Sequence, residues 1–245
     1  MMEHKPESVS RDKPLEDQSG FFDRLITEEW DSYSNPAWDA ARRLEVAEIM
    51  AVARPRRILD VGCGCGFHDR EMAQVPGVES VLGIDYSTHS VKMAEYIYPH
   101  PKVRRIAADI RSLSDGPFDL VVSFQVIEHF PDSQDFLNRC ANLTAPGGWT
   151  AVVTPNGAHL ENRIRRALGR RTVLRDPQHF TEFTLPEVEA MGRRAGLRSI
   201  ASFGHGLSLP LPGLSRALPG PTLGRWLGRM MPRLADVIGV VFQKQ

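Results

Sequence analysis

The sequence has few cysteines, no net charge and no long apolar run. Its 245 residues include only three cysteines, and an odd, sparse set of this kind does not organise a chain of this size through disulfides. No stretch reaches the roughly 18 consecutive apolar residues that a membrane-spanning helix needs, and the polar residues 1–20 lack the apolar core of a secretory signal. We therefore expect a cytoplasmic protein that folds without disulfides.

The charges balance over the chain but are not evenly spread. Thirty Lys and Arg residues offset thirty Asp and Glu residues, which argues against a protein whose whole surface binds nucleic acid. With 42% hydrophobic residues, the chain can bury one core, so we predict a single domain over residues 21–245. Residues 1–20 are polar and aperiodic, and they are predicted to form a disordered or loosely attached arm.

Short apolar runs alternate with segments of helical period along the chain. The runs are typical of buried strands and fall at residues 57–61, 81–84, 103–107, 118–124, 149–154, 197–203 and 237–242. Helices are predicted at residues 37–53, 67–74, 91–98, 132–143 and 185–195, the last with a capping box formed by Thr184 and Glu187. This alternation predicts an α/β fold with a doubly wound sheet and helices on both faces.

Two stretches do not fit the alternation and are predicted to be insertions that form a lid above the carboxyl ends of the strands. Residues 157–177 hold six arginines, which indicate either a phosphate-binding surface or an ordinary solvated basic face. Residues 204–232 are rich in Leu, Pro, Gly and Arg, a mixture that suits an apolar acceptor pocket or contact with a membrane surface. We favour the acceptor pocket, because five prolines oppose one long surface helix.

A glycine-rich turn follows the first predicted strand. The run Asp60-Val61-Gly62-Cys63-Gly64-Cys65-Gly66 lets a ligand approach the backbone closely, and the helix that follows offers unpaired N–H groups. A dinucleotide fingerprint requires its third glycine at position 67, which is Phe67 here, and the Lys-Ser/Thr pair of a P-loop is missing. Cys63 and Cys65 have no second ligand pair at metal-binding spacing, so they are expected to be small turn residues.

These residues resemble the class I S-adenosylmethionine-dependent methyltransferases, which carry D/E-x-G-x-G-x-G at this turn. The segments VLGIDYS, AADIRSL, FDLVVSFQVIEHF and LTAPGGWTAVVTPN are similar to the later motifs of that family, and the E-H pair is similar to that of ubiquinone-biosynthesis O-methyltransferases. The resemblance spans about residues 21–203 plus the final strand. It implies a Rossmann-like seven-stranded sheet whose last strand is antiparallel.

The resemblance also implies a set of residues that bind S-adenosylmethionine and release S-adenosylhomocysteine. Asp85 would accept the two ribose hydroxyls, and Asp109 with the N–H of Ile110 would hold the adenine edge. An arginine of the first helix would meet the donor carboxylate, and Arg42 and Arg43 are both options. The predicted donor set is Arg43, Asp60, Gly62, Cys63, Gly64, Gly66, Asp85, Tyr86, Asp109, Ile110, Phe124, Gln125 and Val126.

Two histidines are candidates for the base that deprotonates the methyl acceptor. His129 follows the fourth strand, and imidazole titrates near neutral pH, although the Glu128–His129 pair is also compatible with a structural role for this loop. His179 is the second candidate, with the capping of its loop as the alternative. No metal-binding residues are predicted.

The acceptor is predicted to be a small molecule, apolar or phosphate-bearing, that is methylated on oxygen. Methylation of nucleic acid is not expected, because the chain lacks a [DN]-P-P-[YF] motif after the fourth strand and a Pro-Cys nucleophile. Peripheral contact with a membrane is not the favoured prediction. Two other functions are also compatible with the sequence: a non-catalytic partner subunit that binds S-adenosylmethionine, and an RNA methyltransferase.

Overall fold

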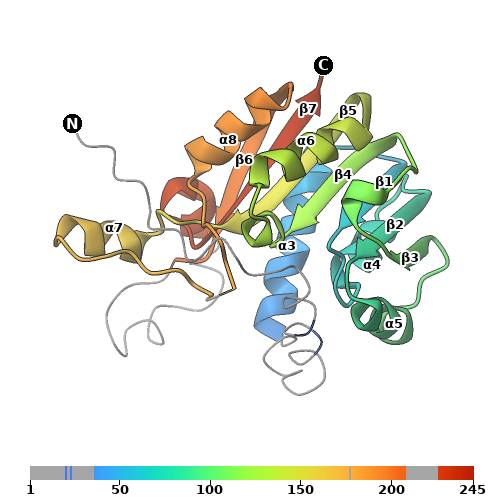
Figure 1. The fold of residues 1–245 in the computed structure, drawn as a ribbon, viewed down its shortest axis with the longest axis horizontal. Helices are drawn as coiled ribbons and strands as arrows, with labels where there is room; N and C mark the ends of the chain where they lie inside the picture. Colours follow the sequence, from blue (N-terminus) through green and yellow to red (C-terminus); the bar gives the residue numbers. More distant parts are fainter. Residues whose placement is uncertain (1–19, 21–22, 24–35, 177, 208–225) are drawn as a thin grey trace.

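The computed structural model describes residues 20, 23, 36–176, 178–207 and 226–245 (Figure 1). Apart from Gly20, the arm predicted over residues 1–20 lies outside this part of the chain, as do residues 208–225 of the predicted insertion 204–232. In the described ranges, no helix has both the length and the apolar character needed to cross a membrane.

A single mixed sheet forms the centre of the described structure. Its seven strands are β1 (Arg57–Val61), β2 (Ser80–Asp85), β3 (Val103–Ala107), β4 (Phe118–Phe124), β5 (Thr144–Pro155), β6 (Leu197–His205) and β7 (Val237–Lys244). They lie in the order β3-β2-β1-β4-β5-β7-β6, so the direction of winding changes between β1 and β4. β7 runs antiparallel to both β5 and β6. The predicted doubly wound sheet with an antiparallel last strand is confirmed.

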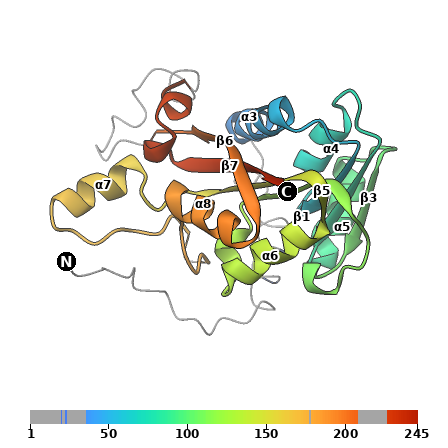
Figure 2. The same cartoon turned by 90° about the horizontal axis from the view of Figure 1, so that it is seen from above.

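Helices cover both faces of this sheet (Figure 2). The helices are α3 (Pro36–Val52), α4 (Phe67–Ala73), α5 (Thr88–Ile97), α6 (Ser133–Leu143), α7 (Leu160–Ala167) and α8 (Leu185–Arg194), with single 3₁₀ turns η1 (Ile110–Ser112), η2 (Ile127–His129) and η3 (Pro232–Leu234). α3 and α4 share one hydrophobic core with the sheet, and α6 and α8 share the other. Because both faces of β4 are covered, its FDLVVSF run is buried at nearly every position.

Two local features differ from the sequence-based expectation. The fifth strand was predicted over residues 149–154, but β5 begins at Thr144, and the Ala145–Gly148 segment forms an irregularity in its pairing with β4. A Cβ atom on Gly148 would lie 2.9 Å from the carbonyl oxygen of Ala145, so this position requires glycine. The second difference is α7, which forms within residues 157–177, where no helix was predicted, and projects from one end of the sheet (Figure 1).

Candidate functional site

The glycine turn lies at the switch point of the sheet, between the end of β1 and the start of α4. Gly62, Gly64 and Gly66 all have positive φ angles, of 76°, 51° and 82°. A Cβ atom on Gly62 would lie 2.5 Å from Cγ2 of Val126, and one on Gly66 would lie 2.8 Å from Nε of Arg105. The turn is therefore a cradle that only glycine residues can form, open to close approach by a ligand.

Asp85 lies beside this cradle at the end of β2. Its two carboxylate oxygens accept hydrogen bonds from the backbone N–H groups of Gly64 (2.9 Å) and Ser87 (2.8 Å). Burial raises the pKa of Asp85 above its usual range and outweighs these two hydrogen bonds. Tyr86, the next residue, is half exposed. Asp85 therefore holds its carboxylate against the glycine turn.

Asp60 is a buried carboxylate that the described residues leave unsatisfied. Only 1% of the residue is exposed, and neither of its side-chain oxygens has a hydrogen-bond partner in the described part of the chain. Burial and the neighbouring Asp69 raise the pKa of Asp60 well above its usual range. An unsatisfied buried acceptor directly before the glycine cradle fits a ligand that brings its own N–H donors.

An ion pair between Arg105 and Asp69, which was not predicted from the sequence, stabilises the glycine turn. The guanidinium of Arg105 donates to both carboxylate oxygens of Asp69, at 2.8 Å each, and both side chains are essentially buried. Arg105 also donates to the carbonyl oxygens of Gly66 (3.4 Å) and Tyr98 (2.9 Å). The pair therefore links the glycine turn to α5 and β3. The sequence signal for this pair was an arginine inside the predicted strand 103–107.

The remaining predicted donor residues lie at the carboxyl ends of β3 and β4. Asp109 caps η1 and forms an ion pair with Arg111 that lowers the pKa of Asp109. Gln125 has a φ of 58°, rare for a residue other than glycine, and such strain is common at functional sites. The backbone N–H of Gln125 donates to the carbonyl of Val153 (2.8 Å), which keeps the end of β4 beside β5.

The structure distinguishes the two arginines of the first helix. The side chain of Arg43 is 53% exposed and pairs with Glu71 (3.3 Å) on α4. The side chain of Arg42 is only 14% exposed and lies 3.6 Å from Asp39 on the same helix. Both guanidinium groups lie over the ring of Phe67, the first residue of α4, at 5.6 Å for Arg42 and 5.3 Å for Arg43. The two arginines therefore differ in their exposure and not in their distance from the start of α4.

A second buried polar group was also not predicted. Glu45 of α3 accepts hydrogen bonds from Nε2 of His68 (2.9 Å) and Nε2 of His205 (2.7 Å), at the ends of α4 and β6. The ring of His68 stacks on Phe124, with centroids 3.8 Å apart and planes 7° from parallel. Glu45 thus fixes a ring that packs on one of the predicted donor-lining residues.

Acid should unfold the protein partly through Glu45. Burial acts to raise the pKa of Glu45, but hydrogen bonds from His205 and His68 outweigh it and hold the pKa at about 2, below its ordinary 4.5. The ionised Glu45 therefore contributes about 3 kcal/mol to the free energy of unfolding above pH 4.5, and this contribution is lost as the pH falls towards 2. In urea unfolding experiments, the stability difference between the wild type and Glu45→Gln should shrink over this range. The control is Glu79→Gln, which removes an exposed carboxylate instead.

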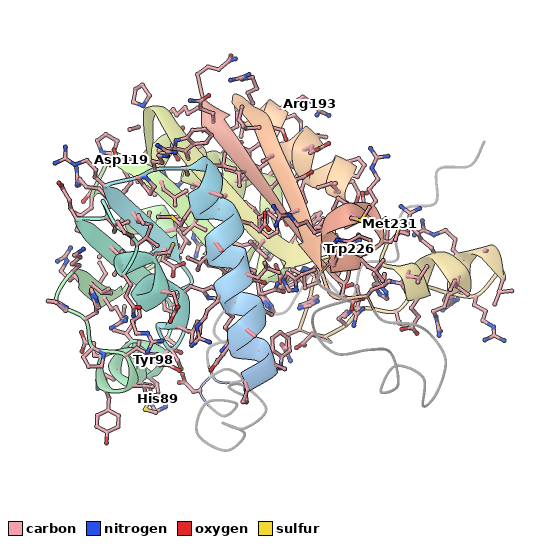
Figure 3. The ribbon with its side chains drawn as sticks, turned by 180° about the vertical axis from the view of Figure 1, so that it is seen from behind. His89, Tyr98, Asp119, Arg193, Trp226 and Met231 are labelled. Atoms are coloured by element: carbon pink, nitrogen blue, oxygen red, sulfur yellow. The ribbon has the colours of Figure 1, made fainter. Side chains whose placement is uncertain are left out.

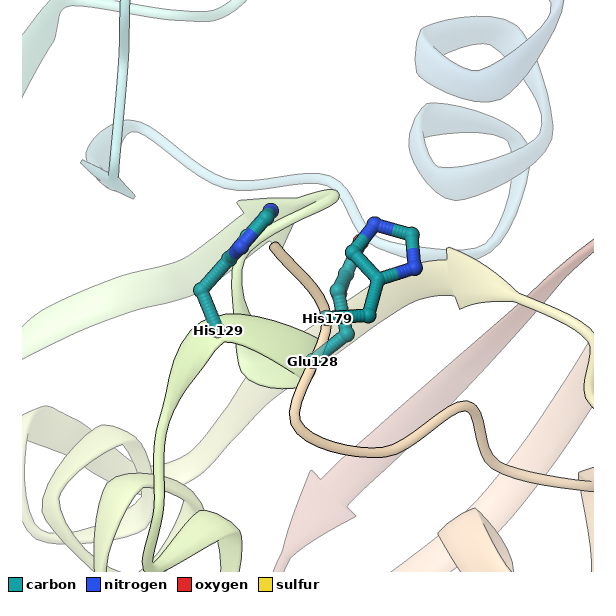
Figure 4. A group of neighbouring side chains, drawn as sticks. All are labelled: Glu128, His129 and His179. Atoms are coloured by element: carbon teal, nitrogen blue, oxygen red, sulfur yellow. The ribbon is translucent and has the colours of Figure 1, made fainter. Parts of the chain in front are cut away.

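The two candidate bases come together at the end of β4, although they are fifty residues apart in the sequence. Glu128 and His129 belong to η2, and His179 comes from the loop that precedes α8 (Figure 4). The imidazole rings of His129 and His179 meet edge to face, with centroids 5.0 Å apart. Thr154 of β5 donates to one oxygen of Glu128 (2.9 Å), and Nδ1 of His179 lies 2.8 Å from Oε1 of Glu182.

Burial and neighbouring charges shift the pKa values of Glu128, His129 and His179 in different directions. Burial raises the pKa of Glu128 to about 7 and, with the nearby charge of His179, lowers the pKa of His129 to about 4. Burial alone would lower the pKa of His179, but the hydrogen bond with Glu182 and the charge of Glu128 raise it. A neutral His129 beside a carboxyl group that titrates near pH 7 is a suitable arrangement for accepting a proton.

The same group could also hold a divalent cation. One ligand atom each from Glu128, His129 and His179 lies within 4.8 Å of the others. One carboxylate and two imidazoles suit ions such as Zn²⁺ or Mn²⁺. The two cysteines of the glycine turn are buried and form no disulfide.

Comparisons with known proteins concern the family and the fold of the chain. Residues 37–202 match a family described as "Methyltransferase domain". A probable S-adenosylmethionine-dependent methyltransferase of Mycolicibacterium smegmatis is 34% identical over 63% of this chain and 57% of its own length. The ubiquinone biosynthesis O-methyltransferase of Bordetella avium is 33% identical over 63% of this chain and 68% of its own. The chain thus spans between about half and two thirds of these relatives.

Solved structures with low sequence identity share the fold. Magnesium protoporphyrin IX methyltransferase from Synechocystis, solved with bound S-adenosylhomocysteine, is similar with a TM-score of 0.66 at 13% identity, over 95% of this chain and all of that one. A Burkholderia thailandensis N1-methyltransferase, solved with 1,6-didemethyltoxoflavin and S-adenosylhomocysteine, has a TM-score of 0.64 at 20% identity, over 98% of this chain and 94% of that one. At these identities the likeness concerns the fold.

Proposed function

Because the chain belongs to the S-adenosylmethionine-dependent methyltransferases, we propose that it methylates an oxygen atom of a small-molecule acceptor. The observation that carries this proposal is the juxtaposition of His129 with Glu128 and His179 beside the switch point of the sheet. The similarity to ubiquinone biosynthesis O-methyltransferases supports oxygen as the methylated atom. Nitrogen is the alternative, since an N1-methyltransferase has the same fold.

The chain's own residues fit the donor. The glycine cradle leaves room for its methionine part, and the unsatisfied oxygens of Asp60 suit its ammonium group. Asp85 is assigned to the ribose hydroxyls, Asp109 and the N–H of Ile110 to the adenine, and Phe124 and Val126 to the apolar walls. When bound, the donor supplies a methyl group on a positively charged sulfur.

His129 removes the proton from the acceptor hydroxyl in the proposed reaction. Its low pKa keeps the imidazole neutral at physiological pH. The acceptor oxygen forms a bond to the methyl carbon while the carbon–sulfur bond breaks, and the electron pair of that bond stays on sulfur. The hydroxyl proton passes to His129, and the ionised form of Glu128 stabilises the imidazolium.

Calorimetric titration with S-adenosylmethionine and S-adenosylhomocysteine tests the donor site. The Asp85→Ala variant should bind both about a hundredfold more weakly or worse, because hydrogen bonds to a carboxylate are each worth about 1.5 to 3 kcal/mol. Asp115→Ala, which removes an exposed carboxylate paired with Arg104, should bind as the wild type does. If neither ligand binds the wild type, the proposed function is wrong. If the donor binds but no acceptor in a panel of phenols, sugars and RNA is methylated, a non-catalytic partner subunit becomes the better description.

A further inference from the structure

A groove with a volume of about 520 Å³ lies where β5 ends and α8 begins. Asn156, which directly follows β5, and Thr184, which caps α8, contribute to its wall. Three arginines, Arg163, Arg166 and Arg233, form the charged part of the lining, and no carboxylate is among the described residues that line the groove.

These arginines come from two parts of the chain. Arg163 and Arg166 are three residues apart on α7 and therefore lie on the same side of that helix. Arg233 belongs to η3, about seventy residues later. The side chain of Asn156 donates to the carbonyl oxygens of Arg233 (3.2 Å) and Ala235 (2.7 Å), which fixes η3 against the end of β5. The fold thus brings the three positive charges to one groove.

The groove arginines differ from their neighbours in their partners. Arg165 pairs with Glu161 (3.7 Å), Arg175 with Asp236 (2.5 Å) and Arg229 with Glu48 (3.1 Å). By contrast, the groove arginines form no ion pair with the described residues.

Arg163 is held in place without losing its ability to bind an anion. Its Nε donates to the carbonyl of Ala158 (2.9 Å), which orients the guanidinium while its terminal nitrogens remain available to a ligand. Three cations that lack carboxylate partners in one groove indicate a site for a multiply charged anion, and guanidinium groups match the geometry of phosphate.

The groove also adjoins the proposed site of methyl transfer. Thr154 of β5, which donates to Glu128, lies two residues before Asn156. Asn156 forms an isolated bridge with Phe183, next to Thr184, and the backbone N–H of Phe180, next to His179, donates to the carbonyl oxygen of Glu128 (2.9 Å). An acceptor whose phosphate occupies the groove would therefore have the rest of its structure close to His129. We propose that the groove binds the phosphate or diphosphate group of the methyl acceptor, an inference that rests on the proposed function. The acceptor is then a soluble phosphate ester rather than a neutral phenol.

Titration of the full chain with inorganic pyrophosphate in low salt tests the site. We expect the Arg163→Ala/Arg166→Ala variant to bind pyrophosphate at least about tenfold more weakly than the wild type, because each lost charge-assisted contact costs upwards of about 1 kcal/mol. Arg233→Ala should lose part of the affinity. The matched control is Arg170→Ala/Arg193→Ala, which removes the same charge outside the groove lining, with Arg193 on α8 at the end of the sheet away from α7 (Figure 3). This control should bind within about twofold of the wild type.

Three outcomes would overturn the inference. Equal losses in the groove and control variants would indicate non-specific attraction. If the wild type binds S-adenosylmethionine but not pyrophosphate, the groove is not a phosphate site, and the proposed function is unaffected. Binding to vesicles of phosphatidylglycerol but not to pyrophosphate would indicate a membrane surface instead.

A comparison of two methyl acceptors tests whether the groove acts in catalysis. For two acceptors that differ only in a phosphate ester, the groove variant should raise KM for the phosphorylated one about tenfold and leave KM for the other unchanged. The affinity for S-adenosylmethionine, measured on the same samples, should be the same in the groove variant and in the Arg170→Ala/Arg193→Ala control. Equal KM changes for both acceptors would contradict a role of the groove in acceptor binding.

Discussion

Replacing Arg105 with leucine should reduce the free energy of unfolding by about 3 to 5 kcal/mol, the usual cost of breaking a buried ion pair by removing one partner. Asp69 would be left without its bidentate partner in a site where both side chains are almost completely buried. Asp60 would lose the same compensating charge, because Arg105 also acts to lower its pKa. The loss should be smaller at pH 5 than at pH 8, since the abandoned carboxyl groups can take up protons at the lower pH.

The neighbouring Arg104 provides the matched control. It lies on the same strand, but its side chain is 67% exposed, and it pairs with the half-exposed Asp115. Arg104→Leu should therefore change the stability by less than about 1 kcal/mol in urea unfolding experiments. Asp69→Asn combined with Arg105→Leu should be less destabilising than Arg105→Leu alone, because no buried charge is then left unpaired. A loss below 1 kcal/mol for Arg105→Leu would show that the pair does not support the glycine turn energetically.

Local signals explain why the sheet and the glycine turn could be predicted from the sequence. A strand that is buried on both faces reads as a continuous apolar run, as in Phe118–Phe124, and a turn that needs positive φ angles requires glycine at Gly62, Gly64 and Gly66. The position of Asp85 followed from the end of its strand. Each of these inferences depends on residues that are close together in the sequence.

Contacts between distant residues could not be predicted in this way. Glu45 and His205 are 160 residues apart, and Asp69 and Arg105 are 36 apart, so only the folded sheet brings these partners together. The same holds for His129 and His179, which were proposed separately and meet only in the structure. α7 was missed because it is short and so rich in arginine that its apolar positions, Leu160 and Ile164, do not stand out.

His129→Ala should lower kcat by about 10² to 10⁴, the usual contribution of general base catalysis, while donor affinity stays unchanged. The reason is the position of this neutral imidazole next to Glu128, whose ionised form would stabilise the proton that His129 receives. Steady-state kinetics with the best acceptor, together with calorimetric titration of S-adenosylhomocysteine, separate the two effects. His100→Ala, which removes a histidine outside the cluster, is the control.

The pH profile makes the prediction for His129 more specific. Because burial raises the pKa of Glu128 to about 7, kcat should rise with pH through about 7 as this carboxyl group ionises, and then level off. Glu128→Gln should remove this rise and keep kcat low at both acidic and alkaline pH. If the rise persists in the variant, a group other than Glu128 causes it. The assay should contain EDTA, since the proposed mechanism uses no metal. If turnover requires added Zn²⁺ or Mn²⁺, or if His129→Ala retains the wild-type kcat, the cluster has a different role and His129 is not the base.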